Sequence, residues 1–218
     1  MTKIHMIAMQ HHPVSLMYQR AVLPSWQKKY NDDITVIEAV TPKDLAYKHK
    51  LDFGKKATRP EKEFTDTEIA VWYSHFERWC WCVKYRKPLV VIEHDSMLVN
   101  DLPDFTNDGY KFLSFVYRDW EKKPHIDLAP GSGYYITPHA AERLVADAVS
   151  RTIRQNSDGH LATVFNLNKQ RRMKDFYYIE QINFDGLNTI DHRNPRSQRK
   201  FVGPNYEDFD IPGLHRKA

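Results

Sequence analysis

The tripeptide Glu93-His94-Asp95 contains the residue types in this sequence that are best suited to chemistry. It follows residues 89–92, a continuous apolar run that is typical of a buried central strand. Because side chains alternate along an extended chain, we expect Glu93 and Asp95 on one side and His94 on the other. Two carboxylates at the end of such a strand favour a hard divalent cation, Mg²⁺ or Mn²⁺, which can hold a diphosphate. The spacing alone equally allows two solvated carboxylates in a turn.

The elements that must position these acids form an alternating series of strands and helices. We expect strands at residues 3–9, 34–40, 89–92, 111–117, 134–137 and 176–184. Helices are expected at residues 16–30, 65–87 and 159–173, with another beginning at Pro138. Pro24 should kink or end the first helix, and residues 44–64 read as a long surface loop. The strand-helix-strand opening predicts a parallel sheet in a single α/β domain, residues 1–192, followed by a basic, irregular tail, residues 193–218.

The helix at residues 65–87 carries the clearest local signal. Thr65 and Glu68 have the spacing of a capping box at its start. An apolar stripe then recurs at intervals of three and four residues: Ile69, Trp72, Phe76, Trp79 and Val83. We interpret these aromatic side chains as core rather than as a ligand-binding box.

Composition narrows the protein class without naming a ligand. The chain has 218 residues, of which 41% are hydrophobic, so it is globular rather than disordered. Its net charge of +4 permits an anionic ligand but does not require one, although basic clusters at residues 48–62 and 193–200 keep nucleic acid open. No apolar run is long enough to span a membrane and no signal-peptide pattern is present, so we expect a cytoplasmic protein. Cys80 and Cys82 are two residues apart and favour neither a disulfide nor a zinc site.

A series of motifs along the chain resembles those of glycosyltransferase family 25, which includes lipopolysaccharide and collagen galactosyltransferases. The resemblance covers about residues 3–190 and rests on Glu68-Ile69, Ser74-His75, Trp79, the strand ending in Glu93-His94-Asp95, Gly131-Ser-Gly-Tyr-Tyr-Ile-Thr-Pro-His-Ala-Ala and Ser157-Asp158. His94 stands where that family's Glu-Asp-Asp has its middle acid. The resemblance implies a GT-A-like (Rossmann-like) fold, with a mostly parallel sheet flanked by helices. It also implies metal-dependent transfer of a sugar from a nucleotide sugar, by analogy a UDP-sugar, to a hydroxyl acceptor.

Within that resemblance, Glu93 and Asp95 are the expected metal and donor ligands. Asp158 is the candidate third acid, either as a metal ligand or as the base that deprotonates the acceptor hydroxyl. The alternative for Asp158 is a helix N-cap, a position that aspartate favours. Glu180, in the last expected strand, is a weaker candidate for the base.

Four further residues are candidates for donor binding. Ser74 and His75 lie beside the apolar stripe of their helix, where a structural role is at least as well supported. Gly131 and Gly133 would let the backbone approach the donor closely, and a plain turn is the alternative. His160 and His192 are weak candidates for metal ligands, because eleven histidines make chance neighbours common.

The acceptor stays open at this stage: a saccharide, a lipid-linked glycan, a protein hydroxylysine or a modified base in DNA. Two other classes of function also remain. A metal-dependent nuclease or phosphoesterase could use Glu93 and Asp95, but it usually needs further carboxylates that converge on the metals. A non-catalytic nucleic-acid-binding module would need neither acid and would lose affinity steeply with salt.

Overall fold

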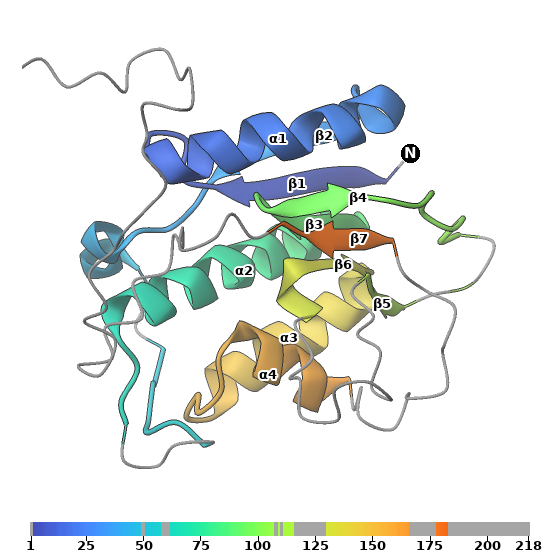
Figure 1. Ribbon diagram of the computed structural model, residues 1–218. Helices are drawn as coiled ribbons and strands as arrows, with labels where there is room; N and C mark the ends of the chain where they lie inside the picture. Colours follow the sequence, from blue (N-terminus) through green and yellow to red (C-terminus); the bar gives the residue numbers. More distant parts are fainter. Residues whose placement is uncertain are drawn as a thin grey trace, which may run out of the picture.

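A five-stranded sheet in the order β2-β1-β3-β6-β5 forms the middle layer of the molecule (Figure 1). The computed structural model describes residues 2–48, 51–57, 62–106, 109, 111–115, 130–165 and 178–182. The strands of this sheet are β1 (Lys3–Ala8), β2 (Ile34–Glu38), β3 (Leu89–Glu93), β5 (Phe112–Ser114) and β6 (Gly133–Ile136). The sheet and its flanking helices confirm the expected α/β class. The expected tail at residues 193–218 lies outside the described residues.

The sheet is parallel in its first half and antiparallel in its second. β1 pairs in parallel with both β2 and β3, as the strand-helix-strand pattern predicts. β6 pairs antiparallel with β3, and β5 pairs antiparallel with β6. The expectation of a mostly parallel sheet is therefore wrong for β6 and β5. This reversal places the start of β6 beside the end of β3, with Gly133 opposite Ile92.

Helices cover both faces of the sheet and bury two separate apolar cores. Helix α1 (Pro13–Tyr30) covers one face, with Trp26 packed in a core that includes Ile4 and Ile92. Helices α2 (Asp66–Tyr85) and α3 (Pro138–Ser150) cover the other face, together with the short α4 (Ser157–Val164) (Figure 1). Their core contains Trp72 and Trp79 and confirms that the aromatic stripe of α2 is structural.

Local capping explains where α2 begins, and the course of α1 differs from expectation. The Thr65 side chain accepts from the Glu68 backbone, and Glu68 reaches back to the Thr65 backbone, which confirms the capping box. Helix α1 begins at Pro13 and continues through Pro24 to Tyr30, so the alternative in which Pro24 ends the helix is wrong. Pro24 lies on an exposed turn of α1, where its ring faces solvent and the carbonyl it leaves unbonded can be hydrated.

The predicted loop at residues 44–64 contains regular structure in the part that is described. It begins within the 3-10 helix η1 (Pro42–Tyr47), and Phe53 forms a parallel bridge with Ile153. Lys48 forms an ion pair with Glu77 at 2.5 Å, and Lys56 forms one with Glu68 at 2.5 Å. Both glutamates belong to α2. These two basic side chains of the cluster at residues 48–62 are therefore engaged with acids of the same chain.

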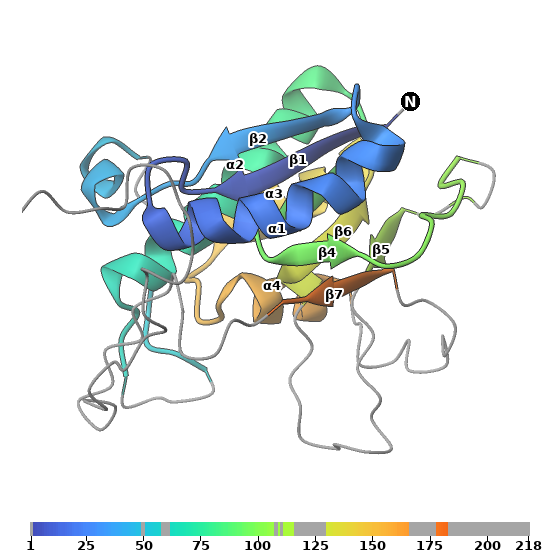
Figure 2. The same cartoon turned by 45° about the horizontal axis from the view of Figure 1, so that its top comes forward.

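A second, two-stranded sheet lies beside the end of β3. Strand β4 (Ser96–Leu98) pairs antiparallel with β7 (Ile179–Gln181), and the pair lies next to the main sheet on the side of α1 (Figure 2). The chain passes from β3 to β4 through a turn at residues 94–95. The acidic motif therefore lies between two sheets, at the point where the chain leaves one and enters the other.

Candidate functional site

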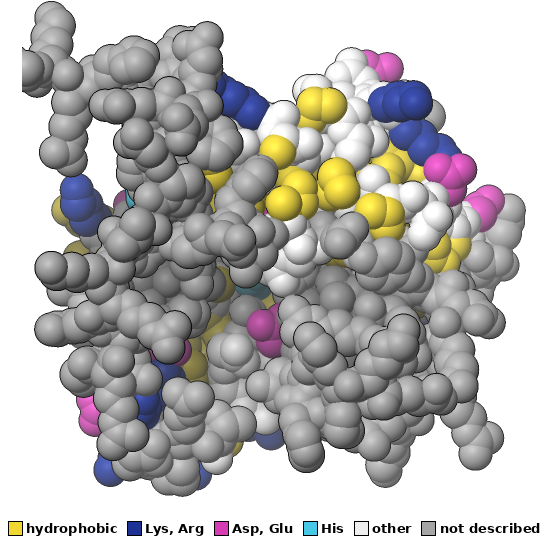
Figure 3. Space-filling model, in the orientation of Figure 1, with side chains coloured by type: hydrophobic (Ala, Val, Ile, Leu, Met, Phe, Trp, Pro, Cys, Tyr) yellow, Lys and Arg dark blue, Asp and Glu magenta, His cyan; other side chains and the backbone are white. Residues whose placement is uncertain are grey.

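Four segments meet at the carboxyl end of β3. The parallel strands β1 and β3 end on the same edge of the sheet, and the antiparallel β6 begins there. The 3-10 turn η2 (Pro130–Ser132) leads into β6 and contacts both β3 and α4. An acidic side chain reaches the surface near the centre of the face in Figure 3, close to the region where α4 lies in Figure 1. Ligands of open α/β sheets bind at this kind of edge.

Glu93 lies on the face of the sheet that α2 covers. It is two residues beyond Val91, whose cross-strand partner Tyr134 belongs to the α2 core. The Oε1 atom of Glu93 is 3.4 Å from Nε2 of the buried His75, and the Glu93 side chain keeps 23% of its surface exposed. Burial raises the pKa of Glu93, but the hydrogen bond from His75 and the electrostatic attraction of the neighbouring His75 and His94 rings together hold this pKa below its usual value. Glu93 is therefore a carboxylate that is anchored at one oxygen and reaches solvent.

Asp95 is tied to the segment around β7 through one carboxylate oxygen and its own main-chain carbonyl. Its Oδ2 accepts a hydrogen bond from Nε2 of Gln181 at 3.0 Å, and its main-chain carbonyl accepts from the Ile182 N–H at 2.8 Å. In the part of the chain that the structure describes, the buried Oδ1 has no hydrogen-bond partner. Burial, and then the charge of Glu93, raise the pKa of Asp95 to about 7. The pKa of a buried carboxyl group beside a second carboxylate is raised in this way until a positive charge binds near the pair.

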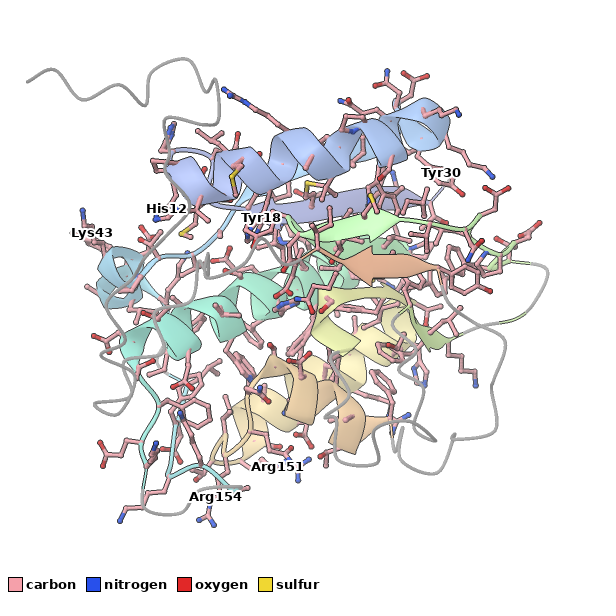
Figure 4. All side chains as sticks on the ribbon, viewed as in Figure 1. His12, Tyr18, Tyr30, Lys43, Arg151 and Arg154 are labelled. Atoms are coloured by element: carbon pink, nitrogen blue, oxygen red, sulfur yellow. The ribbon has the colours of Figure 1, made fainter. Side chains whose placement is uncertain are left out.

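Buried hydrogen bonds hold the turn that carries Asp95. The Ser96 hydroxyl donates to the Ser132 carbonyl at 2.6 Å, which ties β4 to η2. The indole N–H of Trp26 donates to the Ser96 carbonyl at 2.7 Å, which ties the same residue to α1. The ring of His94 packs edge-on against Tyr18 at 5.4 Å between centroids, and Figure 4 shows Tyr18 on the side of α1 that faces the sheet. His94 therefore points away from Glu93, as alternation predicts, whereas Asp95 is set by the turn.

Asp158 reaches the same edge from the first turn of α4. Its Oδ1 accepts the Gly131 N–H at 2.7 Å. A Cβ atom built on Gly131 would lie 2.8 Å from that oxygen and 3.6 Å from Nε2 of His75. Asp158, His75 and Glu93 thus converge around η2. The alternative in which Asp158 caps α4 is wrong, because the cap is Asn156, whose side chain accepts the Gly159 N–H at 3.0 Å.

The other expected site residues have mainly internal contacts. The Ser74 hydroxyl accepts the Val40 N–H at 2.9 Å and donates to the Ala70 carbonyl at 3.0 Å, so it ties α2 to the end of β2. Gly133 faces core side chains: a Cβ there would overlap the Ile179 side chain and lie 3.3 Å from Phe115. The backbone of Glu180 lies in β7, opposite Met97, and its side chain is outside the described atoms.

Of the two weaker histidine candidates, only His160 is described, and it is not brought to these acids. His160 stacks on Trp79 with ring centroids 5.5 Å apart, inside the α2 core, and burial lowers its pKa to about 4. His192 lies outside the described residues. Among the described residues, no group of three or more histidine, cysteine or acidic side chains is arranged to hold a metal. Glu93 and Asp95 could therefore supply two ligands, with the remaining ones coming from a bound ligand and water.

A surface cavity of about 250 Å³ lies elsewhere and does not include the acids. It is lined by Lys111, Phe112, His139, Ala140, Arg143 and Phe165. Phe112 pairs with Ile136 at the end of β6, whereas Glu93 lies beyond the start of that strand. The cavity and the acidic motif therefore lie at opposite edges of the sheet.

Comparison with known proteins identifies the family. Residues 1–130 match the family described as "Glycosyltransferase family 25 (LPS biosynthesis protein)", which is more than half of the chain. The chain belongs to glycosyltransferase family 25. Family 25 membership makes it a sugar transferase, and the sheet flanked by helices agrees with the GT-A-like fold expected from the resemblance. The match includes Glu93 and Asp95 and ends before Gly131 and Asp158.

Among solved structures, the apo form of mouse xyloside xylosyltransferase 1 is similar to this family 25 chain. The alignment covers 78% of this chain and 82% of that chain, with 10% sequence identity and a TM-score of 0.39. No curated protein matches the chain. In the described part of the chain, no helix is both long enough and apolar enough to cross a membrane.

Sequence reasoning missed three residues that shape this site: Tyr134, Gln181 and Ser96. Tyr134 belongs to a short expected strand and to the motif that begins at Gly131, but its contact with His75 depends on the register between β3 and β6. Gln181 contacts Asp95 because β7 pairs with β4, a pairing across more than 80 residues that no local pattern indicates. Ser96 follows the acidic motif directly, and a small hydroxyl residue after a turn was the available signal.

Proposed function

We propose that this protein transfers a sugar from a nucleotide-sugar donor to a hydroxyl acceptor, with a divalent cation bound by Glu93 and Asp95. The observation that supports this most strongly is the buried Oδ1 of Asp95, which has no hydrogen-bond partner among the described residues and lies near a second carboxylate. A buried carboxylate oxygen without a partner costs free energy unless a cation or a hydrogen-bond donor binds to it. Mg²⁺ and Mn²⁺ both prefer such oxygen ligands.

The residues present fit a cation at this edge of the sheet. Glu93 is anchored by His75 at one oxygen while its side chain remains partly exposed, and Asp95 is anchored by Gln181 through Oδ2. Each acid is thus oriented by a neighbour, as ligands of bound metals usually are. When bound, the cation would hold the diphosphate and neutralise the charge that develops on it as the sugar leaves. We propose a UDP-sugar as the donor, which is what the family resemblance implies.

Asp158 is the proposed base for the acceptor. Its carboxylate is positioned by the Gly131 N–H and lies on the α4 side of the site, across η2 from the β4–β7 pair that holds Asp95. A base must lie within hydrogen-bond reach of the hydroxyl it deprotonates, so we propose that the acceptor binds on this side of the site. Glu180 remains the second candidate for this role.

A screen for release of the donor's nucleotide tests the proposal. Purified protein is incubated with UDP-, GDP- and CMP-sugars, with and without Mn²⁺, in the presence of saccharide acceptors or DNA. We expect release from one nucleotide class that requires the cation and is lost in Asp95→Ala. The matched control is Asp101→Ala, which removes an exposed acid paired with Lys29 and should leave release unchanged. Turnover that persists in a folded Asp95→Ala variant would overturn the proposal.

The acceptor arm of the same screen separates a glycan from a modified base in DNA. The basic cluster at residues 193–200, which keeps DNA open, lies outside the described residues. We propose a glycan or another small hydroxyl acceptor first, because the described part of the cluster at residues 48–62 has Lys48 and Lys56 paired with acids of α2. Transfer to DNA alone would assign the nucleic-acid acceptor instead.

A further inference from the structure

A buried chain of hydrogen bonds leads from the core of α2 to the Glu93 carboxylate. Trp79 Nε1 lies 2.8 Å from the Tyr134 hydroxyl, that hydroxyl lies 3.2 Å from Nδ1 of His75, and Nε2 of His75 lies 3.4 Å from Oε1 of Glu93. Trp79, Tyr134 and His75 are fully buried. His75 and Trp79 are four residues apart on α2 and therefore lie on one face of that helix. Tyr134 meets them from β6.

The direction of each bond follows from what each group can donate. An indole N–H can only donate, so Trp79 donates to the Tyr134 oxygen. The Tyr134 O–H must then go to another acceptor, and Nδ1 of His75 is the acceptor that the described structure provides. Burial raises the pKa of Tyr134 above its usual value, so this proton stays on the hydroxyl. An Nδ1 atom that accepts a hydrogen bond leaves the imidazole proton on Nε2, which faces Glu93.

The alternative directions leave a buried group unsatisfied. If His75 carried its proton on Nδ1, two N–H groups would point at the Tyr134 oxygen, and Nε2 would present a lone pair to the Glu93 carboxylate. The Tyr134 O–H would then lack any acceptor recorded in the described structure. An unmade hydrogen bond at a fully buried hydroxyl is costly, so the chain of bonds selects a single arrangement.

We propose that Tyr134 and Trp79 are positioning residues that hold His75 as the Nε2–H tautomer and, through it, orient the Glu93 carboxylate toward the proposed cation. The proposal rests on the proposed function for what Glu93 binds, but the tautomer of His75 can be measured without any ligand. The anchor is rigid, because Trp79 packs against Trp72 at 5.3 Å and is stacked on His160 at 5.5 Å between ring centroids. Neighbours that orient a metal ligand in this way typically affect metal affinity by ten-fold or more.

The experiment compares two tyrosines that are adjacent in β6. Tyr134→Phe removes the hydroxyl that links Trp79 to His75 in the buried chain of hydrogen bonds. Tyr135→Phe removes a hydroxyl on the opposite face of the strand, in the α1 core. Long-range ¹H–¹⁵N spectra of histidine-labelled full-length protein, without metal or donor, report the tautomer of His75, and His75→Gln assigns its signals. Calorimetric titration with Mg²⁺ in the presence of UDP reports affinity, and circular dichroism confirms that each variant is folded.

We expect the Nε2–H tautomer in the wild-type protein and in Tyr135→Phe. In Tyr134→Phe we expect a mixture of tautomers and Mg²⁺ affinity about ten-fold weaker. Trp79→Phe, which removes the first donor, should weaken affinity in the same direction. His75→Gln should retain more affinity than His75→Leu, because the glutamine amide can still donate to Glu93.

Two results would overturn this proposal. One is an Nδ1–H or doubly protonated His75 in the wild-type protein, and the other is a folded Tyr134→Phe variant with unchanged His75 tautomer and unchanged Mg²⁺ affinity. Failure of the proposed function looks different. In that case the wild-type protein would bind no Mg²⁺, while His75 still had the Nε2–H tautomer and lost it in Tyr134→Phe.

Discussion

Replacing Gly131 by alanine should impair catalysis more than folding. A Cβ at this position would lie 2.8 Å from Oδ1 of Asp158, whereas ordinary contact begins near 3.4 Å, so the carboxylate must move by roughly half an ångström. The hydrogen bond from the Gly131 N–H at 2.7 Å would lengthen as a result. Since a misplacement of about 1 Å can cost about a hundred-fold in rate, we expect kcat to fall roughly ten-fold. The loss of stability should stay within about 2 kcal/mol, because a side chain and not the backbone must move.

The assay is steady-state UDP release by the donor class found in the screen, alongside unfolding in urea. The matched control is Gly54→Ala, where a Cβ would lie 2.6 Å from Cγ2 of Thr152, on the bridge to residues 152–154 and away from the acids. It should lose comparable stability with an unchanged kcat. If a folded Gly131→Ala variant keeps the wild-type kcat, Asp158 has no part in the chemistry.

Three further outcomes follow from the packing of the described residues. Gly133→Ala should destabilise the fold by about 1–3 kcal/mol, since its Cβ would overlap the Ile179 side chain in the core; an unchanged urea midpoint would contradict this. Burial lowers the pKa of His5 and of His160 to about 4, so the unfolded chain binds more protons below about pH 6.5. Stability should therefore be complete above that pH and fall by roughly 3 kcal/mol for each histidine toward pH 4, as urea midpoints across this range would show. Burial raises the pKa of the Cys82 thiol to about 12, so this thiol should react with DTNB at pH 8 only after unfolding, and rapid reaction in the native protein would count against its burial.

The sequence predicted best the elements whose signals are local. The start of α2 follows from Thr65 and Glu68, whose side chains complete a capping box, and β3 spans Leu89–Glu93, as its apolar run predicts. The long helix near the N-terminus was also expected, and it continues through Pro24 rather than ending there. An exposed proline breaks a helix only when packing does not compensate for the lost hydrogen bond, and Val22 and Trp26 pack against the sheet on either side of it.

Strand direction could not be read from the residues themselves. Residues 133–136 have the same apolar character whether they pair parallel or antiparallel with β3. In the structure β6 is antiparallel to β3, so η2, which precedes β6, lies at the end of the sheet that carries Glu93. That outcome brings Gly131 and Asp158 close to His75, a meeting that sequence order alone does not predict.

The sequence indicated candidate residues for the site but not how they are arranged. Alternation placed Glu93 and Asp95 on one side, but the strand ends at Glu93, so the turn and the hydrogen bond from Gln181 decide where Asp95 lies. Asp158 was proposed either as an active-site acid or as a helix cap, and the nearby Asn156 takes the cap. Side-chain chemistry is visible in a sequence, whereas partners supplied by long-range pairing are not.

Crystals of the protein soaked with Mn²⁺ and a UDP-sugar provide the most direct test of the central claim. Anomalous scattering locates manganese independently of any assumption about its ligands. We expect one manganese peak at the carboxylates of Glu93 and Asp95, together with the bound donor. A bound donor with no manganese at those carboxylates, or manganese held elsewhere, would contradict the account.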